Sequence, residues 1–132
     1  MATGRCQICA RRVRLNVRGE IAGHYHRGER CAGANYAPIE REDSQLLECA
    51  RLQRAIASRL AAEIADLMDR RVNRIEPELL ERYGRACATA SRLERRLARH
   101  RAWPERFRRD MERHGYGCPP PAYLVERERL AA

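Results

Sequence analysis

Four residues near the start of the chain have the types and spacing of metal ligands. Cys6 and Cys9 form a CxxC pair, His24 follows after fourteen residues, and Cys31 comes after six more. Three thiols and one imidazole are the soft ligands that a tetrahedral structural Zn²⁺ site uses. His26 is an alternative to His24 as the third ligand. We therefore expect a structural zinc site, which has no open coordination position and so no catalytic role.

A CxxC pair also occurs in thioredoxin-like redox proteins, where the motif opens a helix after a strand. In this chain basic, strand-like sequence follows the motif instead, which favours metal binding. Of the other cysteines, Cys49 and Cys87 fall on apolar helical seams, and Cys118 lies near His114 with no second pair to complete a site. Metal-bound thiolates in a reducing cytoplasm fit this distribution better than a disulfide framework.

The sequence has none of the motifs typical of membrane proteins, secreted proteins or common enzyme classes. No stretch approaches the roughly 20 apolar residues of a membrane span, and the first residues lack the apolar core of a secretory signal. The chain has no phosphate loop, no HExxH motif and no nucleophile elbow. We expect a cytoplasmic protein that is not an enzyme, with no small-molecule substrate and no membrane contact.

The chain is strongly basic, with a formal net charge of +9, and all 27 of its basic residues are arginines. Such a charge favours an anionic partner, nucleic acid above all. The excess is uneven: residues 1–36 carry seven arginines against two acids, and residues 37–75 carry seven against seven. Residues 76–114 carry eleven against seven. The positive charge therefore lies on the N-terminal head and on the second helical stretch.

Within the head, Val13, Leu15 and Val17 alternate with polar residues, which is the pattern of a half-buried strand. Arg18 and Gly19 can turn the chain into a second short strand, so we expect a β-hairpin. Its arginine-rich face, with the neighbouring loops, can track phosphate groups, or it can be a solvated face without a ligand. The candidate nucleic-acid contacts are Arg11, Arg12, Arg14, Arg18, Arg27 and Arg30.

Residues 5–35 resemble the short CxxC…H…C zinc-finger (zinc-ribbon-like) segments found in small proteins of high-GC actinobacteria and their phages. In those segments the second cysteine is usually followed by glycine, and the last by a loop similar to Pro-Gly-Ser-Gly. This chain has Ala10 at the first position and Ala-Gly-Ala-Asn, residues 32–35, at the second. The resemblance implies a zinc-binding module with all four ligands present.

Beyond the head the apolar residues recur at helical spacing. A first helix is expected to begin at Pro38, or at an N-cap on Ser44, and to continue to about Arg74. Pro77 ends it and begins a second helix, to about Arg101, whose apolar residues alternate in steps of four and three. That heptad seam is typical of a coiled coil.

A short third helix is expected after Trp103-Pro104, with Phe107 and Met111 on one face and Gly115 as its C-cap. The three prolines at 119–121 predict an extended tail, followed at 123–125 by a short strand or a docking segment. The predicted fold is mostly α. A zinc-ribbon-like β-hairpin (1–36) precedes a long helical hairpin with a short third helix (37–115) and an extended Pro-rich tail (116–132).

At 1.5 Å per residue the first helix would be about 55 Å long and the second about 37 Å. The overhang predicts that a protein partner or a second copy covers the longer helix. The leading functional hypothesis is a non-enzymatic zinc-finger protein that contacts nucleic acid or a nucleic-acid-processing complex. The alternative is a protein-interaction factor, such as a phage-type modulator of a host protein, in which zinc only stabilises the head.

Overall fold

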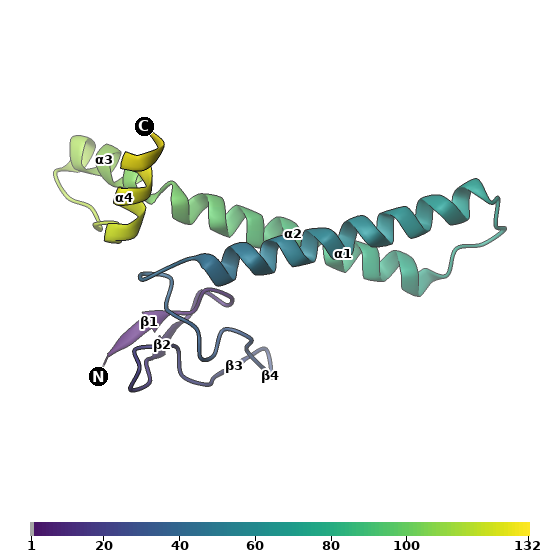
Figure 1. Cartoon of the computed structure of the whole chain (residues 1–132), viewed down its shortest axis with the longest axis horizontal. Helices are drawn as coiled ribbons and strands as arrows, with labels where there is room; N and C mark the ends of the chain where they lie inside the picture. The colour runs from purple at the N-terminus through teal and green to yellow at the C-terminus, as the bar shows by residue number, and fades with distance from the viewer. Residues whose placement is uncertain (1) are drawn as a thin grey trace. The chain divides into compact units, whose positions relative to one another are not determined.

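The computed structural model describes residues 2–132 and is mostly helical, as predicted (Figure 1). Its element order begins with two small antiparallel hairpins, β1 (Thr3–Arg5) with β2 (Arg12–Arg14) and β3 (Tyr25–His26) with β4 (Glu29–Arg30). Four helices follow: α1 (Ser44–Asp69), α2 (Pro77–Arg101), α3 (Trp103–His114) and α4 (Ala122–Ala131). None of the helices in the described part of the chain has the length and apolar character needed to cross a membrane.

The chain forms two compact units. One contains the residues up to Leu46 together with Leu97–Ala132, so it joins the two ends of the sequence. The other, Leu47–Arg96, is the helical hairpin made by most of α1 and α2. The C-terminal residues thus pack in the same unit as the head, and the division into 1–36, 37–115 and 116–132 stays a prediction.

In the head, the predicted pairing of 13–17 with 20–22 is reduced to one isolated bridge between Leu15 and Ile21. Residues 12–14 pair mainly with β1, a strand that the sequence pattern did not predict. Val17 is fully exposed at the tip of the turn rather than half-buried. Three residues of β1 are too few for an alternating pattern, so only their pairing across the CxxC loop defines them as a strand.

Helix α1 begins at Ser44, the later of the two predicted starts, and ends before Arg74. Its end is a Schellman motif. Arg71 has a left-handed φ of 52°, the N–H of Arg71 donates to the carbonyl of Met68, and the N–H of Val72 donates to that of Leu67. Glycine usually occupies the left-handed position, so an arginine there gives no sequence signal. The two long helices have 26 and 25 residues, and the predicted overhang is absent.

The hairpin buries the apolar seam that the spacing in α2 predicts. Leu79 and Ala86 of α2 are buried against Ala57 and Leu60 of α1. Six more side chains pack around them partly buried: Ile56, Ile64, Leu67, Ile75, Tyr83 and Cys87. Cys87 is therefore a small apolar contact of this core, as expected.

Helix α3 has the predicted start and C-cap: Gly115 has a φ of 74° and donates its N–H to the carbonyl of Met111. The prediction of an extended tail is wrong for residues 122–131, which form α4. Pro121 keeps extended angles (φ −58°, ψ 146°) and precedes the helix. Leu124 is buried, and Arg108 of α3 forms an ion pair with Glu128. Tertiary packing of this kind overrides the weak local signal of a short segment.

Candidate metal centre

The first two candidate ligands lie in the tight loop between β1 and β2. The N–H of Cys6 donates to the carbonyl of Arg11, and the carbonyl of Cys6 accepts the N–H of Ala10. Ala10, which directly follows the second cysteine, has a left-handed φ of 63°. The antiparallel register of β1 and β2 therefore closes the loop and holds Cys6 and Cys9 on one knuckle.

The other two candidate ligands flank the second hairpin. His24 immediately precedes β3 and Cys31 immediately follows β4. Arg27 and Gly28 both have positive φ values, 53° and 80°, which is the geometry of a two-residue type I′ turn. The N–H of Cys31 donates to the carbonyl of His24 at 3.0 Å. This hairpin therefore places His24 and Cys31 next to each other at its open end.

The four side chains converge. The sulfurs of Cys6, Cys9 and Cys31 and a ring nitrogen of His24 all lie within 4.8 Å of one another. The Sγ atoms of Cys6 and Cys31 are 3.7 Å apart, and Cys9 Sγ is 3.3 Å from His24 Nε2. Tetrahedral Zn²⁺ with its usual bond lengths has edges of about 3.8 Å between two sulfurs and about 3.6 Å between sulfur and nitrogen. The donor set and these two distances fit a tetrahedral ion.

The geometry favours His24 over His26 as the candidate metal ligand. Nδ1 of His24 lies 2.9 Å from the carbonyl oxygen of Ala22, which fixes it as a hydrogen-bond donor. Nε2 is then unprotonated in the neutral ring and faces the thiol of Cys9. A second hydrogen bond of this kind is the usual way in which a protein orients a metal-binding imidazole. His26 is outside the cluster, so the alternative assignment is not supported.

The thiols of the cluster have different acidities. Burial, helped by the nearby sulfurs of Cys31 and Cys9, raises the pKa of Cys6 to about 12, although the backbone N–H groups of Cys9 and Ile8 act in the other direction. For Cys9, burial also opposes ionisation, but the N–H of Arg11 and the ring of His24 lower the pKa. A dication is the natural counter-charge for such a group of thiolates, and its binding displaces their protons.

The redox interpretation of the CxxC pair has no support in the fold. The motif connects two strands and does not open a helix. All six cysteines, at positions 6, 9, 31, 49, 87 and 118, are free thiols. Cys118 is exposed, its carbonyl oxygen accepts the Trp103 indole N–H, and His114 stacks on Tyr116. Residues 2–132 contain no second group of metal donors, so His114 and Cys118 do not form half of another site.

One residue without a ligand atom is essential to the geometry of the cluster. A Cβ atom at Gly33 would lie only 2.1 Å from Cys6 Sγ and 3.6 Å from Cys31 Sγ. The loop after Cys31 therefore passes directly over the sulfurs, at a distance that only glycine allows. The sequence hypothesis did not include Gly33, although a glycine two residues after the last cysteine is the signal that could have indicated it.

Two glutamines connect the metal centre to the start of α1, and neither role was predicted from the sequence pattern. Gln7, fully buried between Cys6 and Cys9, donates to the carbonyl of Ala37 and accepts the N–H of Leu46 in the first turn of α1, both at 2.9 Å. Gln45 donates to the carbonyl of Ala32, in the loop that follows Cys31. The first turn of a helix has backbone N–H groups without helical partners, and Gln7 satisfies one of them.

The six candidate arginines of the head are all exposed. Arg12 and Arg14 project from the same side of β2, because alternate residues of a strand share a face. The guanidinium of Arg11 donates to the carbonyl of Tyr25, and that of Arg12 to the hydroxyl of Thr3. None of the six takes part in an ion pair with another described residue. The pairs formed are Arg54–Glu94, Arg70–Asp66, Arg85–Glu81, Arg101–Asp43, Arg108–Glu128, Arg127–Asp43 and Arg129–Glu126.

A second buried polar cluster lies in the same unit, around Asp43. Its carboxylate accepts hydrogen bonds from Arg101 at 3.0 and 3.3 Å and from Arg127 at 3.4 Å. Tyr123 of α4 donates its hydroxyl proton to the carbonyl of Ile39, and so it accepts the Nε2–H of the buried His100. The cluster joins three segments: the residues before α1, the last residues of α2, and helix α4.

Comparison with known proteins adds no further assignment. A scan against protein-family models and searches of curated proteins and of solved structures found no match to this chain.

Proposed function

We propose that this chain is a non-enzymatic zinc-finger protein whose N-terminal head contacts nucleic acid or a nucleic-acid-processing complex. The observation that carries the proposal is the convergence of Cys6, Cys9, His24 and Cys31 in a head whose six exposed arginines form no ion pair with another described residue. The resemblance to zinc-finger segments of actinobacterial and phage proteins points the same way. A reducing cytoplasm, where the three thiols stay free to bind metal, is the matching compartment.

Zinc is the metal that this donor set favours, because three thiolates and one imidazole form a soft tetrahedral site. Its role is structural. All four coordination positions come from the protein, so none remains for water or a substrate. Among the described residues, the buried apolar cluster of the head consists of Cys6, Ile21 and Cys31, with Ile8, Cys9, Val13 and Leu15 partly buried around it. Such a core is too small to fold a loop-rich module without further stabilisation. When bound, zinc would crosslink the two hairpins of the head.

The arginines supply the binding surface. Residues 1–36 have a net charge of +5, from seven arginines and two acids, and Arg12, Arg14 and Arg18 are all exposed on or beside the first hairpin. Unpaired guanidinium groups on a small rigid module attract phosphates and release bound counterions, which makes the affinity depend on salt. This surface suits contacts with the phosphate backbone more than with base edges, because no helix of the head is available to enter a groove.

The test is a binding titration of the zinc-loaded protein with a short fluorescein-labelled DNA duplex and with an RNA of the same sequence. We expect the logarithm of the affinity to fall linearly with that of the salt concentration. Replacing Arg12, Arg14 and Arg18 by alanine should reduce both the affinity and this slope. The matched control removes three arginines from the segment after α1 instead, Arg70, Arg71 and Arg74.

Two outcomes would contradict the proposal. One is the absence of binding to either nucleic acid at low salt. The other is an equal loss of affinity in the head variant and in the control variant, since that result indicates a general effect of charge. Either outcome would favour the alternative of a protein-interaction factor with a zinc-stabilised head.

A further inference from the structure

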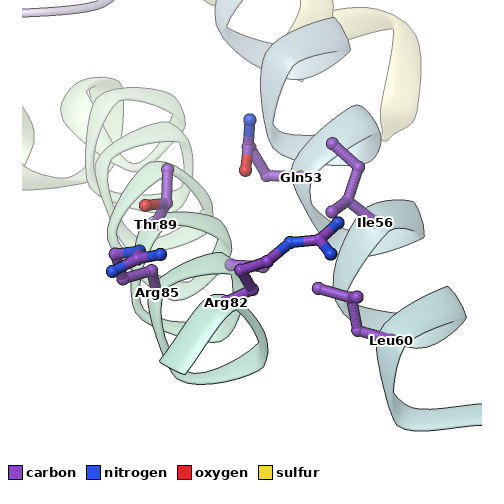
Figure 2. A pocket seen from close by; sticks show the side chains of 7 residues that line it. Gln53, Ile56, Leu60, Arg82, Arg85 and Thr89 are labelled. Carbon is purple, nitrogen blue, oxygen red and sulfur yellow. The ribbon is translucent and has the colours of Figure 1, made fainter. Parts of the chain in front are cut away.

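The helical hairpin has an open groove on one side. Its volume is about 230 Å³, and Figure 2 shows its walls. The lining side chains are Gln53, Ile56 and Leu60 from α1 and Arg82, Arg85 and Thr89 from α2. In Figure 2 the side chain of Arg82 points from α2 toward Ile56 and Leu60. The groove therefore has an apolar wall on one helix and a cationic wall on the other.

Charges of both signs that form no ion pair with another described residue flank the groove: Arg82 on α2, and Arg59 and Glu63 on α1. Arg85 is paired with Glu81 on its own helix, and the hairpin also contains the pairs Arg54–Glu94 and Arg70–Asp66. Within the described residues, neither Arg82 nor Glu63 takes part in an ion pair. Glu63 is exposed and follows Leu60 by three residues and Ile56 by seven, so it extends from the same side of α1.

The hairpin also leaves apolar surface uncovered next to the groove. Leu52, one turn before Ile56, keeps 58% of its surface exposed. The buried cluster between the two helices of the hairpin is made of small and medium side chains, Ala57, Leu60, Leu79 and Ala86. Two helices can bury only the stripe that they share, and stable helical bundles add further helices across the remaining apolar side.

We propose that the groove is a self-association site, occupied by α1 of a second copy of this chain. In a two-fold symmetric pair, Glu63 of each copy meets Arg82 of the other, so the complementary contact forms twice. Ile56 and Leu52 of each copy then cover the apolar wall of the opposite groove. In this pairing the surface is self-complementary because Arg82 and Glu63, of opposite charge, lie beside the same apolar stripe.

Sedimentation equilibrium of the full zinc-loaded chain, freed of nucleic acid, tests the proposal first. We expect a reversible monomer–dimer equilibrium. Arg82→Glu places two acids opposite each other at both contacts, and Glu63→Arg places two arginines there. Each single variant should weaken dimerisation by about tenfold or more, since two ion pairs become two repulsions. Arg95→Glu makes the same charge change on α2 outside the groove, and it should dimerise like the wild type.

Mixing the two single variants gives the sharpest test. In a heterodimer of the R82E chain with the E63R chain, both contacts are again between opposite charges. We expect the mixture to dimerise about as strongly as the wild type although each component alone does not. An interaction between Arg82 and Glu63 within one chain cannot produce this result, because each variant chain keeps its own substitution in the mixture. Only contacts between the two chains change on mixing.

A wild-type chain that stays monomeric at all concentrations would overturn the proposal. So would dimerisation that is insensitive to both charge reversals, because the interface would then lie elsewhere. Circular dichroism of each variant checks that the helices are retained. If the single variants fold and lose dimerisation but their mixture does not recover it, reciprocal pairing across the groove is wrong.

Discussion

At the scale of single residues, the geometry of the metal centre depends on residues that provide no metal ligand. Gly33 lets the loop after Cys31 pass over the sulfur of Cys6, and Ala10 takes a left-handed conformation at the end of the CxxC knuckle. The carbonyl of Ala22 orients the ring of His24. These residues determine whether four suitable ligands can share one ion.

The most direct consequence concerns Gly33. In Gly33→Ala the new methyl group would overlap Cys6 Sγ, so the loop or the thiol must move. We expect the affinity for zinc to fall by about 10- to 100-fold, as for other residues that support metal ligands. Competition with a chromophoric zinc chelator measures the change. Gly84→Ala is the control, because its added methyl group meets no atom within 4 Å. Equal affinities for zinc in both variants would refute this role of Gly33.

Ala10 gives a prediction of opposite sign. Its φ of 63° lies in the left-handed region, which costs a residue with a side chain about 1–2 kcal/mol relative to the right-handed region. Ala10→Gly should therefore raise the free energy of unfolding of the zinc-loaded protein, by about 0.5–1 kcal/mol after the larger entropy of unfolded glycine is included. Denaturant unfolding measures it. Ala55→Gly, at an exposed position in the middle of α1, should instead destabilise by about 1 kcal/mol.

At the scale of elements, the start of α1 is built around the metal centre. Gln7 satisfies the N–H of Leu46 in the first turn, and Gln45 binds the loop after Cys31. The carboxylate of Glu40, in the segment before α1, accepts the N–H of Arg5 at 3.0 and 3.1 Å. Folding of the head and formation of the first turn of α1 are therefore coupled through these hydrogen bonds, of which that of Gln7 is buried.

Removing the Gln7 side chain tests this coupling. Gln7→Ala leaves the N–H of Leu46 and the carbonyl of Ala37 buried without their partner, so we expect a loss of about 2–3 kcal/mol in the free energy of unfolding. Gln53→Ala is the matched control, because Gln53 makes no such bonds and is only half-buried. Thermal unfolding of both variants with zinc bound provides the comparison. A loss no larger than that of the control would contradict the coupling.

The extent of sequence-based prediction also varies by element. Pro77, the heptad seam and Gly115 were sufficient to predict α2 and α3, because local rules govern those boundaries. The four ligands were identifiable from spacing alone, since zinc demands particular residue types. The end of α1 at Arg71 and the helix after Pro121 were not predictable in this way. Both depend on backbone geometry or tertiary packing that leaves no local pattern.

At the scale of the whole molecule, the two ends of the sequence meet in one unit, joined by the cluster around Asp43. His100 is buried beside Tyr123, and burial is the main cause that lowers its pKa below the usual 6.5. The nearby charges act in both directions, because Asp43 and Glu40 favour the protonated ring and Arg101 and Arg106 oppose it. Burial acts to raise the pKa of Asp43. The hydrogen bond and charge of Arg101 and the charge of Arg127 outweigh burial, so the pKa of Asp43 is lowered overall.

Stability should therefore decrease in acid. The pKa of His100 is lower in the folded than in the unfolded state, so the unfolded state binds more protons as the pH falls below about 6.5. The contribution of His100 is complete above that pH and is lost as the pH falls toward its folded pKa. The pKa of Asp43 is also lower in the folded state, so its contribution to stability is lost in the same direction, at lower pH. His100→Gln should flatten the unfolding free energy between about pH 5 and 7, measured in denaturant titrations. An unchanged slope would rule out His100 as the cause.

The most direct measurement is the metal content of the protein, by elemental mass spectrometry on freshly purified material after exhaustive dialysis. The convergence of Cys6, Cys9, His24 and Cys31 predicts one zinc ion per chain. It also predicts that Cys6→Ser loses the ion, while Cys118→Ser, at an exposed thiol outside the cluster, retains it. Protein without metal, or a Cys6→Ser variant with a full equivalent of zinc, would contradict the central claim that a zinc ion folds this head.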